Sequence, residues 1–329
     1  MTTLAPTLEA FFTQRLIAQR RSSPHTIAAY RDAFRLLLGF VHDTTGTPPA
    51  KLDLPVIDAP LVAAFLDHLE ADRGVAITTR NARLAAIHSF FHYAALRHPE
   101  HAALIQRVLA IPAKRTDRGP ISYLTAAEID ALLAAPDCAT RLGRRDHALL
   151  TLALQTGLRV SELCGLCRDD ITLGTGAAVS CMGKGRKQRA TPLTAATASV
   201  VSNWLKESPG APDGPLFPGP QGRPLSRDAI RRLVERHVAT AISSCPSLAT
   251  KRVAPHVLRH SCAMQLLDAG VDVAVIALWL GHESIRTTDI YQHADLAMKE
   301  RALARLTPNH ASPGRYRPPD ALLAFLEAL

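Results

Sequence analysis

The sequence predicts a mainly α-helical chain with a small β-sheet, organised as a helical module followed by a mixed α and β domain. Before about residue 110, apolar side chains recur at the three-to-four-residue spacing of helices. Between Ile171 and Pro192 this period gives way to a short stretch rich in glycine and β-branched residues, which indicates strands joined by a basic turn. The length of 329 residues exceeds the usual size of one domain, so we expect two.

Helices are expected throughout the first domain, residues 1–112. Ser23 is a candidate N-cap, and Pro24 suits the first helical position after it. The apolar residues that repeat with helical spacing are Leu8, Phe11 and Phe12, then Ile27, Tyr30, Phe34, Leu37, Leu38 and Val41, then Leu61, Val62, Phe65, Leu66 and Leu69, and finally Ile77, Leu84, Ile87, Phe90 and Phe91. These side chains are the predicted core of a small all-helical domain.

A proline-bounded basic stretch over residues 113–122 separates the two patterned regions and is the expected linker. Its basic residues are Lys114, Arg115 and Arg118. On a nucleic-acid-binding protein these cations would lie along phosphates, whereas elsewhere they would form a solvated connector. Both interpretations stay open at this point.

The second domain, residues 123–310, is expected to begin with a helix capped by Thr125 and Glu128, which have the capping-box spacing. Gly157 is a natural end for the following helix. A later helix, SRDAIRRLVERHVATAI, has an apolar face formed by Ile230, Leu233, Val234, Val238 and Ala241. Its opposite face carries Arg227, Arg231 and Arg232. This basic face is a candidate DNA contact or a solvated surface.

Composition and charge favour a soluble protein that binds an anionic partner. Lys plus Arg number 38 against 29 Asp plus Glu, a formal charge of +9, and the isoelectric point is about 9.6. Such a balance is suited to nucleic acid. No run of 18 apolar residues and no basic segment followed by an apolar one at the N-terminus is present, so we expect neither a membrane span nor a signal peptide, and a cytoplasmic location.

The six cysteines are scattered through the chain, which favours reduced thiols over a disulfide framework. Cys164 and Cys167 form a CGLC pair, but no second pair exists to complete a tetrahedral zinc site. We therefore expect small residues packed on a helix there, and no metal.

The segment APHVLRHSCAMQLLDAG presents a sharper choice. His256 and His260 are four residues apart, as zinc-binding histidines often are, but Arg259 lies between them. Pro255 suits the first turn of a helix, and the N-terminus of a helix together with an arginine fork favours an anion such as phosphate. Further polar residues in exposed-looking turns are Arg159, Lys184, His282 and Tyr291. Cations and a phenol predominate in this set.

At these residues the chain resembles the tyrosine recombinases, also called the phage integrase family. The matching segments are TGLRVSELCGL, GKGRKQRATPL, HVLRHSCA and LGHESIRTTDIYQH, in the family's order, with Tyr291 nine residues after His282. The resemblance covers the whole chain. It implies that the leading helices form a core-binding, SAM-like domain and that the second domain is the catalytic one.

The resemblance also implies roles for six residues. Tyr291 would attack a scissile DNA phosphate to give a 3′-phosphotyrosine and a free 5′-hydroxyl. Arg159 and Arg259 would hold the non-bridging oxygens, and Lys184 would protonate the leaving 5′-oxygen. His256 would take part in proton transfer with the nucleophile, and His282 would donate a hydrogen bond to the phosphate. A phenol needs such neighbouring cations because its ordinary pKa is about 10.

The implied partner is double-stranded DNA at specific sites, bound by a homotetramer that exchanges strands through a Holliday junction, with accessory DNA-bending or directionality factors. No cofactor is expected, because the phosphotyrosine bond conserves the phosphodiester energy and the chain has no P-loop pattern. Residues 311–329 form a tail whose apolar residues are Leu322, Leu323, Phe325, Leu326 and Leu329. A helix there either docks on the next protomer, as is common in the family, or packs within its own chain.

The tail segment YQHADLAMKERALARL is more typical of integrases of mobile elements than of chromosome-dimer resolvases, so we expect a role in integration or excision. Several alternatives stay open. They are an Xer-like resolvase of chromosome or plasmid dimers, a type IB topoisomerase, a DNA-binding regulator with an inert site, and a metal-dependent hydrolase built on His256 and His260.

Overall fold

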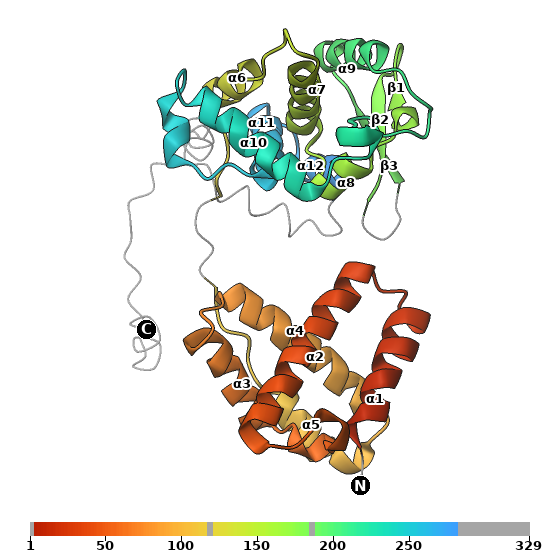
Figure 1. Ribbon diagram of the computed structural model, residues 1–329, viewed down its shortest axis with the longest axis vertical. Helices are drawn as coiled ribbons and strands as arrows, with labels where there is room; N and C mark the ends of the chain where they lie inside the picture. Colours follow the sequence, from red (N-terminus) through yellow and green to blue (C-terminus); the bar gives the residue numbers. More distant parts are fainter. Residues whose placement is uncertain (1–2, 117–120, 184–187, 282–329) are drawn as a thin grey trace, which may run out of the picture. The chain divides into compact units, whose positions relative to one another are not determined.

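The computed structural model describes residues 3–116, 121–183 and 188–281, and the chain separates into two compact units, Met1–Gly119 and Pro120–Leu329 (Figure 1). Four predicted site residues lie outside the described residues, namely Arg118, Lys184, His282 and Tyr291. The tail over residues 311–329 lies outside them as well. The described part is mostly helical with one three-stranded sheet, which confirms the predicted fold class.

The first unit is entirely helical in its described part. Its helices are α1 (Leu4–Ala10), which continues as the π-helix η1 (Phe11–Gln19), α2 (Pro24–Thr45), α3 (Ala59–Ala71), α4 (Ile77–Ala95) and α5 (Ala102–Leu109), with 3-10 turns at Pro49–Lys51, Leu54–Val56 and Pro99–His101. The Ser23 hydroxyl accepts a hydrogen bond from the Thr26 amide, and Pro24 occupies the first turn, so the predicted cap is confirmed.

The core of the first unit is an aromatic cluster inside an aliphatic shell. Phe11 is fully buried, and its ring lies within 6.3 Å of the rings of Tyr30, Phe34 and Phe90. Most of the predicted stripe residues are buried with it, because aromatic edges and faces pack well at these separations. Ile77 is an exception, since it lies in the first turn of α4 and is 39% exposed.

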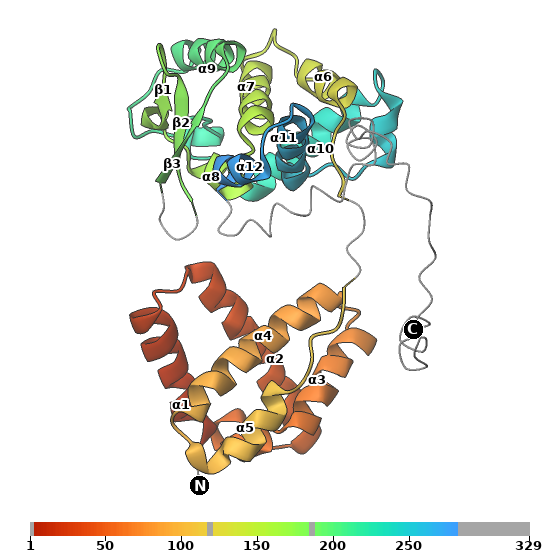
Figure 2. The same ribbon diagram turned by 180° about the vertical axis from the view of Figure 1, so that it is seen from behind.

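The second unit contains the sheet and seven helices in its described residues (Figure 2). They are α6 (Ala126–Ala134), α7 (Arg141–Thr156), α8 (Val160–Gly165), β1 (Ile171–Thr172), β2 (Ala178–Met182), β3 (Gln188–Pro192), α9 (Ala195–Glu207), α10 (Arg227–Ala241), α11 (Pro255–Asp268) and α12 (Val273–Leu280), with 3-10 turns at Arg168–Asp170, Pro220–Gly222 and Pro246–Thr250. The strands are antiparallel in the order β1-β2-β3. The predicted strands and the Thr125–Glu128 capping box are both confirmed.

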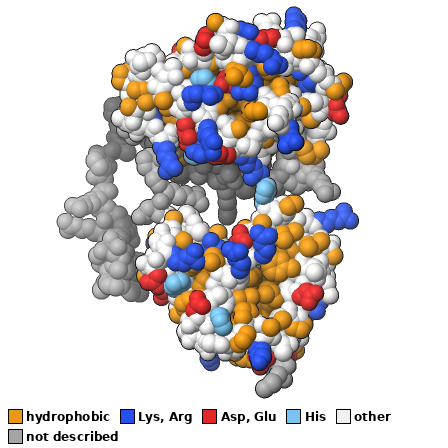
Figure 3. Space-filling model, in the orientation of Figure 1, with side chains coloured by type: hydrophobic (Ala, Val, Ile, Leu, Met, Phe, Trp, Pro, Cys, Tyr) orange, Lys and Arg blue, Asp and Glu red, His pale blue; other side chains and the backbone are white. Residues whose placement is uncertain are grey.

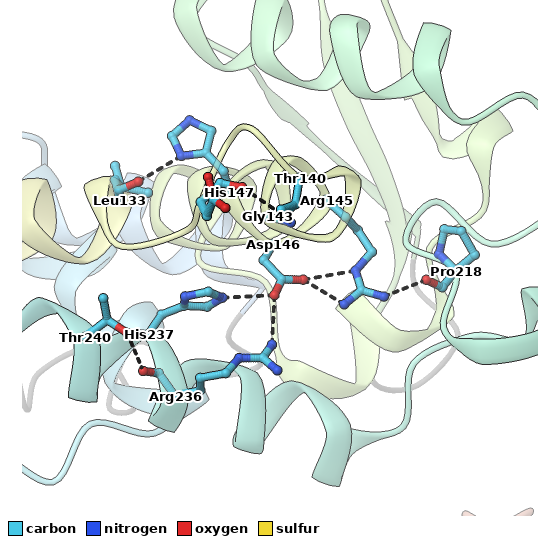
Figure 4. A network of polar contacts seen from close by, with 11 residues as sticks. Leu133, Thr140, Gly143, Arg145, Asp146, His147, Pro218, Arg236, His237 and Thr240 are labelled. Atoms are coloured by element: carbon cyan, nitrogen blue, oxygen red, sulfur yellow. Dashed lines mark hydrogen bonds and ion pairs between the residues drawn. The ribbon is translucent and has the colours of Figure 1, made fainter.

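Helix α7 is the centre of the second unit, since it packs against α6, α9 and α11. A buried ion cluster fastens it to α10 (Figure 4). The carboxylate of Asp146, 2% exposed, accepts hydrogen bonds from Arg145 at 3.0 and 2.7 Å, and from Arg236 and His237 at 2.9 Å each. Burial opposes ionisation, but these donors outweigh it and the pKa of Asp146 is lowered. The cluster therefore holds one end of α7 while its other end forms the candidate site.

On the visible face of each unit, Lys and Arg side chains are widely spread (Figure 3), in keeping with the formal charge of +9. No helix in the described residues is both long and apolar enough to span a membrane.

Candidate active site

Two helix ends form the frame of the candidate site. Helix α7 ends at Gly157 and α12 ends at Gly281, and both glycines have left-handed backbone, with φ of 63° and 64°. The last carbonyl groups of a helix have no partner within the helix and carry partial negative charge. These two ends are therefore natural anchors for cations.

Arg259 lies in the second turn of α11 and is buried, with 8% exposure. Its Nη1 donates to the Gly157 carbonyl oxygen at 2.6 Å, and its Nη2 donates to the Leu280 carbonyl oxygen at 2.7 Å. The guanidinium thus bridges the C-terminal ends of α7 and α12. These two hydrogen bonds hold the Arg259 side chain in a defined orientation.

Arg159, at the start of α8, also bonds to the C-terminal end of α12. It is the N-cap of α8, and its side chain is 33% exposed. Its Nη2 donates to the Gly281 carbonyl oxygen at 3.0 Å. Since Leu280 and Gly281 are adjacent, the two arginines that the sequence pairs only by motif are brought together at the end of α12.

Glu162 completes the frame and was not singled out from the sequence. It is 8% exposed and accepts hydrogen bonds from the Arg159 backbone amide at 2.7 Å and from Arg159 Nη1 at 2.9 Å. Arg189 donates to the same carboxylate at 3.0 and 2.8 Å. Burial opposes ionisation, but the hydrogen bonds from Arg189 and Arg159 outweigh it, so the pKa of Glu162 is lowered. The available signal was a glutamate three residues after a helix start, a position from which its carboxylate can accept from the N-cap amide, as it does from Arg159.

The two histidines of the opening motif differ in environment. His256 is exposed in the first turn of α11, whereas His260 lies one turn further on and is partly buried, with the two ring centroids 5.8 Å apart. Burial, with smaller effects of His256 and Arg259, lowers the pKa of His260 to about 4. His260 is therefore neutral at pH 7, as expected of a supporting residue.

The glycines leave no room for side chains. A Cβ on Gly157 would lie 2.5 Å from Leu280 Cδ2 and 3.2 Å from Cys262 Sγ. A Cβ on Gly281 would lie 2.8 Å from Arg189 Nη1.

Burial raises the pKa of Cys262 to about 12, which marks it as a packing residue in the core next to Arg259.

The remaining candidates lie in several places. Lys114 and Arg115 are exposed at the end of the first unit, and Lys114 Nζ donates to Glu70 at 2.8 Å. On α10, Arg227, Arg231 and Arg232 are all exposed, and both Arg231 and Arg232 pair with Asp228. These ion pairs offset part of the basic face that the sequence predicts.

Among the described side chains, no group of three or more His, Cys, Asp or Glu residues could hold a metal ion. Cys164 lies on α8 and Cys167 beyond its end, so only the first fits the expected helix. The arginine pair instead gives the site a net positive character. Fold and site together define a two-unit, mainly helical protein in which two arginines are held at one helix end, an arrangement that suits an anionic ligand.

Comparison with known proteins identifies the family. The model of the phage integrase family matches residues 122–298, and the model of the phage integrase N-terminal SAM-like domain matches residues 10–98. Over 326 residues the chain is 56% identical to a protein of Sinorhizobium fredii (strain NBRC 101917 / NGR234) that bears the name integrase/recombinase y4rC, covering 99% of this chain and 98% of that protein. It is 37% identical to the tyrosine recombinase XerC of Rhodospirillum centenum, covering 84% of this chain and 80% of that one. The chain therefore belongs to the phage integrase family of tyrosine recombinases.

Solved structures share the fold. The XerH site-specific recombinase bound to a palindromic difH substrate superposes with a TM-score of 0.69 at 24% identity, covering 87% of this chain and 81% of that one. The Tn1549 transposon integrase in complex with transposon right end DNA superposes with a TM-score of 0.70 at 17% identity, covering 93% and 99%. Both comparisons agree with the predicted combination of a SAM-like domain and a catalytic domain.

Proposed function

We propose that this chain is a site-specific recombinase that cuts and rejoins double-stranded DNA through a 3′-phosphotyrosine intermediate and a Holliday junction, for the integration or excision of a mobile element. The observation that carries the proposal is the convergence of Arg159 and Arg259 on the adjacent carbonyls of Leu280 and Gly281. Two fixed cations at one point suit the two non-bridging oxygens of a phosphodiester.

In the proposed reaction the Tyr291 oxygen attacks phosphorus, and the bond from phosphorus to the 5′-oxygen breaks. The phenolic proton passes toward His256, and Lys184 gives a proton to the departing 5′-oxygen. Arg159, Arg259 and His282 stabilise the charge on the pentacoordinate phosphorus. Rejoining reverses these steps with a new 5′-hydroxyl. The family resemblance supports the roles of Lys184, His282 and Tyr291, which lie outside the described residues.

The proposed partner is double-stranded DNA at specific sites. Its support is the overall charge of +9 and the likeness to recombinases solved in complex with DNA, XerH and the Tn1549 transposon integrase. We assign core binding to residues 1–112, a linker to 113–122 and catalysis to 123–310. Candidate phosphate contacts are Lys114, Arg115, Arg118, Arg227, Arg231 and Arg232.

We further propose a homotetramer on DNA, in which the tail over residues 311–329 docks on the next protomer. The tail has an apolar set of residues, and the described part of α12 exposes Leu278 by 78% and Val275 by 46%. Apolar surface of this kind is expected where another segment packs. Accessory DNA-bending or directionality factors would act on this assembly.

The mobile-element role has a specific rival, because the relatives include both an integrase/recombinase and XerC. An Xer-like resolvase of chromosome or plasmid dimers would act on a resolution site, whereas an integrase would act on the ends of the element around its gene. Offering both kinds of DNA to the purified protein distinguishes the two roles.

A covalent trapping experiment tests the proposed function. The protein is incubated with nicked suicide substrates made from the ends of the surrounding element, in excess chelator. We expect a protein–DNA adduct that is absent in Tyr291→Phe, because the phenolic oxygen is the nucleophile. Adduct formation in Tyr291→Phe would refute the nucleophile, and specific binding without any adduct would favour the inert regulator. Loss of activity in chelator would favour the metal-dependent hydrolase, and relaxation of supercoiled DNA lacking the site would favour the topoisomerase.

A further inference from the structure

Arg189 forms a buried, two-pronged ion pair with Glu162. Its Nη1 donates to Oε1 at 3.0 Å and its Nη2 to Oε2 at 2.8 Å, and the two side chains are 13% and 5% exposed. Paired arginine–carboxylate hydrogen bonds fix geometry more tightly than a single contact does. Arg189 belongs to β3 and Glu162 to α8, so the pair fastens the sheet to the start of that helix.

The same carboxylate also holds Arg159. Glu162 Oε1 accepts from Arg159 Nη1 at 2.9 Å, and Oε2 accepts from the Arg159 amide at 2.7 Å. Arg189 in addition lies against Gly281, whose carbonyl holds Arg159 Nη2 at 3.0 Å. Arg189 is thus bonded to the carboxylate that orients Arg159 and lies beside the glycine whose carbonyl holds Arg159 Nη2.

Arg189 lies close to the turn that joins β2 and β3, so its ion pair with Glu162 fixes the start of that turn. In the ladder Arg189 pairs with Cys181, and the last pair before the turn is Met182 with Gln188. Lys184 belongs to the five residues, 183–187, that join this last pair. The ion pair is therefore one ladder step from the point where the turn begins, and it fixes that point relative to Arg159.

The guanidinium of Arg189 is committed to this structural contact. Both of its Nη atoms are bonded to Glu162, and its Nε is buried without a hydrogen-bond partner among the described residues. A two-pronged pair with a carboxylate neutralises the guanidinium, unlike the uncharged carbonyl contacts of Arg259, so we expect Arg189 to act through its neighbours rather than on a substrate.

We propose that Arg189 is a positioning residue for the general acid, setting the hairpin that carries Lys184 against the phosphate-binding Arg159 through Glu162. This inference rests on the proposed function, since it requires that Lys184 protonates the leaving 5′-oxygen. It assigns a role in the reaction to a residue that binds neither the phosphate nor the nucleophile.

The test compares two suicide substrates that differ in one atom, the bridging 5′-oxygen or a sulfur in its place. A thiolate leaves without protonation, so cleavage of the sulfur substrate does not need a general acid. We expect Arg189→Gln to slow adduct formation on the oxygen substrate by at least about tenfold, as a partial loss of general-acid catalysis. On the sulfur substrate we expect a rate within about threefold of the parent, since the arginines still bind the phosphate.

Arg144→Gln is the matched control, because Arg144 makes a comparable two-pronged pair with Glu207 at 2.7 and 2.6 Å, between α7 and α9. It should leave both rates unchanged. If Arg189→Gln does not fold, the two rates are measured on Arg189→Lys, which keeps the positive charge but cannot form the two-pronged hydrogen bond. An equal loss on both substrates, or no loss on either, would overturn the inference.

Lys184→Ala separates this inference from the function beneath it. This variant should form the adduct slowly on the oxygen substrate and at a rate close to that of the parent on the sulfur substrate. If Lys184→Ala is equally slow on both while the parent cleaves both, Lys184 is not the general acid and the inference fails with it. A parent that forms no adduct with either substrate would instead refute the proposed function.

Discussion

Arg159 and Arg259 are oriented largely by peptide carbonyl oxygens. Arg259 bridges the ends of two helices, and Arg159 combines a helix-end carbonyl with the Glu162 carboxylate. A carbonyl attracts a guanidinium without neutralising it, whereas a carboxylate does neutralise it. The site therefore keeps positive charge for an anionic ligand, with only one buried carboxylate beside the pair among the described residues.

His260 makes the stability of the second unit depend on pH. Its pKa is about 4 in the folded chain, below the ordinary 6.5, because burial disfavours the charged ring. As the pH is lowered from 7.5 to 5, the unfolded chain therefore takes up a proton that the folded chain does not. The free energy of unfolding decreases as a result. We expect this group to contribute a loss of roughly 1–2 kcal/mol at pH 5.

Urea unfolding followed by tryptophan fluorescence measures this loss, since Trp204 and Trp279, the only tryptophans, both belong to the second unit. The His260→Leu variant should show a flatter dependence between pH 7.5 and 5. His256→Gln, on the exposed first turn of the same helix, should retain it. An unchanged slope in His260→Leu would contradict the assignment.

At the scale of the elements, the C-terminal ends of α7 and α12 position the two arginines. Each end is a glycine in the left-handed region, packed against a neighbouring side chain, Leu280 at Gly157 and Arg189 at Gly281. Glycine is needed there for two separate reasons, backbone conformation and space. The two reasons can be separated by experiment.

Gly281→Ala should impair both stability and DNA cleavage. Its φ of 64° costs an alanine roughly 1–2 kcal/mol, and its Cβ would lie 2.8 Å from Arg189 Nη1. The matched control is Gly270→Ala, with φ of 80° and nothing within 4 Å of the new Cβ. We expect both variants to lose stability, Gly281→Ala by more because of the added overlap with Arg189, and at least about tenfold slower adduct formation only in Gly281→Ala, as for other displaced catalytic groups. Equal cleavage rates in the two variants would show that the contact with Arg189 has no consequence.

Local chemistry in the sequence was sufficient to predict many of these elements. Ser23 and the Thr125–Glu128 pair cap helices where predicted, and Gly157 ends α7 as predicted, because each acts within four residues of chain. The strands on either side of the basic turn were predicted for the same reason.

At the scale of the whole molecule, the contacts that join elements were not predictable from the sequence. Asp146 meets Arg236 and His237 across 90 and 91 residues, and Glu162 meets Arg189 across 27. Periodicity describes one face of one element and says nothing about which faces meet. The motif residues Arg159 and Arg259 could be paired by family resemblance, whereas their shared anchor at the end of α12 required the structure.

We propose that this anchored arginine pair binds the charged oxygens of the scissile phosphate. It is tested most directly with a suicide substrate whose scissile phosphate carries a methyl group in place of one non-bridging oxygen, which removes the negative charge. On ordinary phosphate, Arg259→Ala should slow adduct formation by at least about a hundredfold, as for loss of a major electrostatic contact. On the neutral methylphosphonate it should approach the parent rate. If Arg259→Ala is equally slow on both substrates, Arg259 does not act by binding the charged phosphate oxygen.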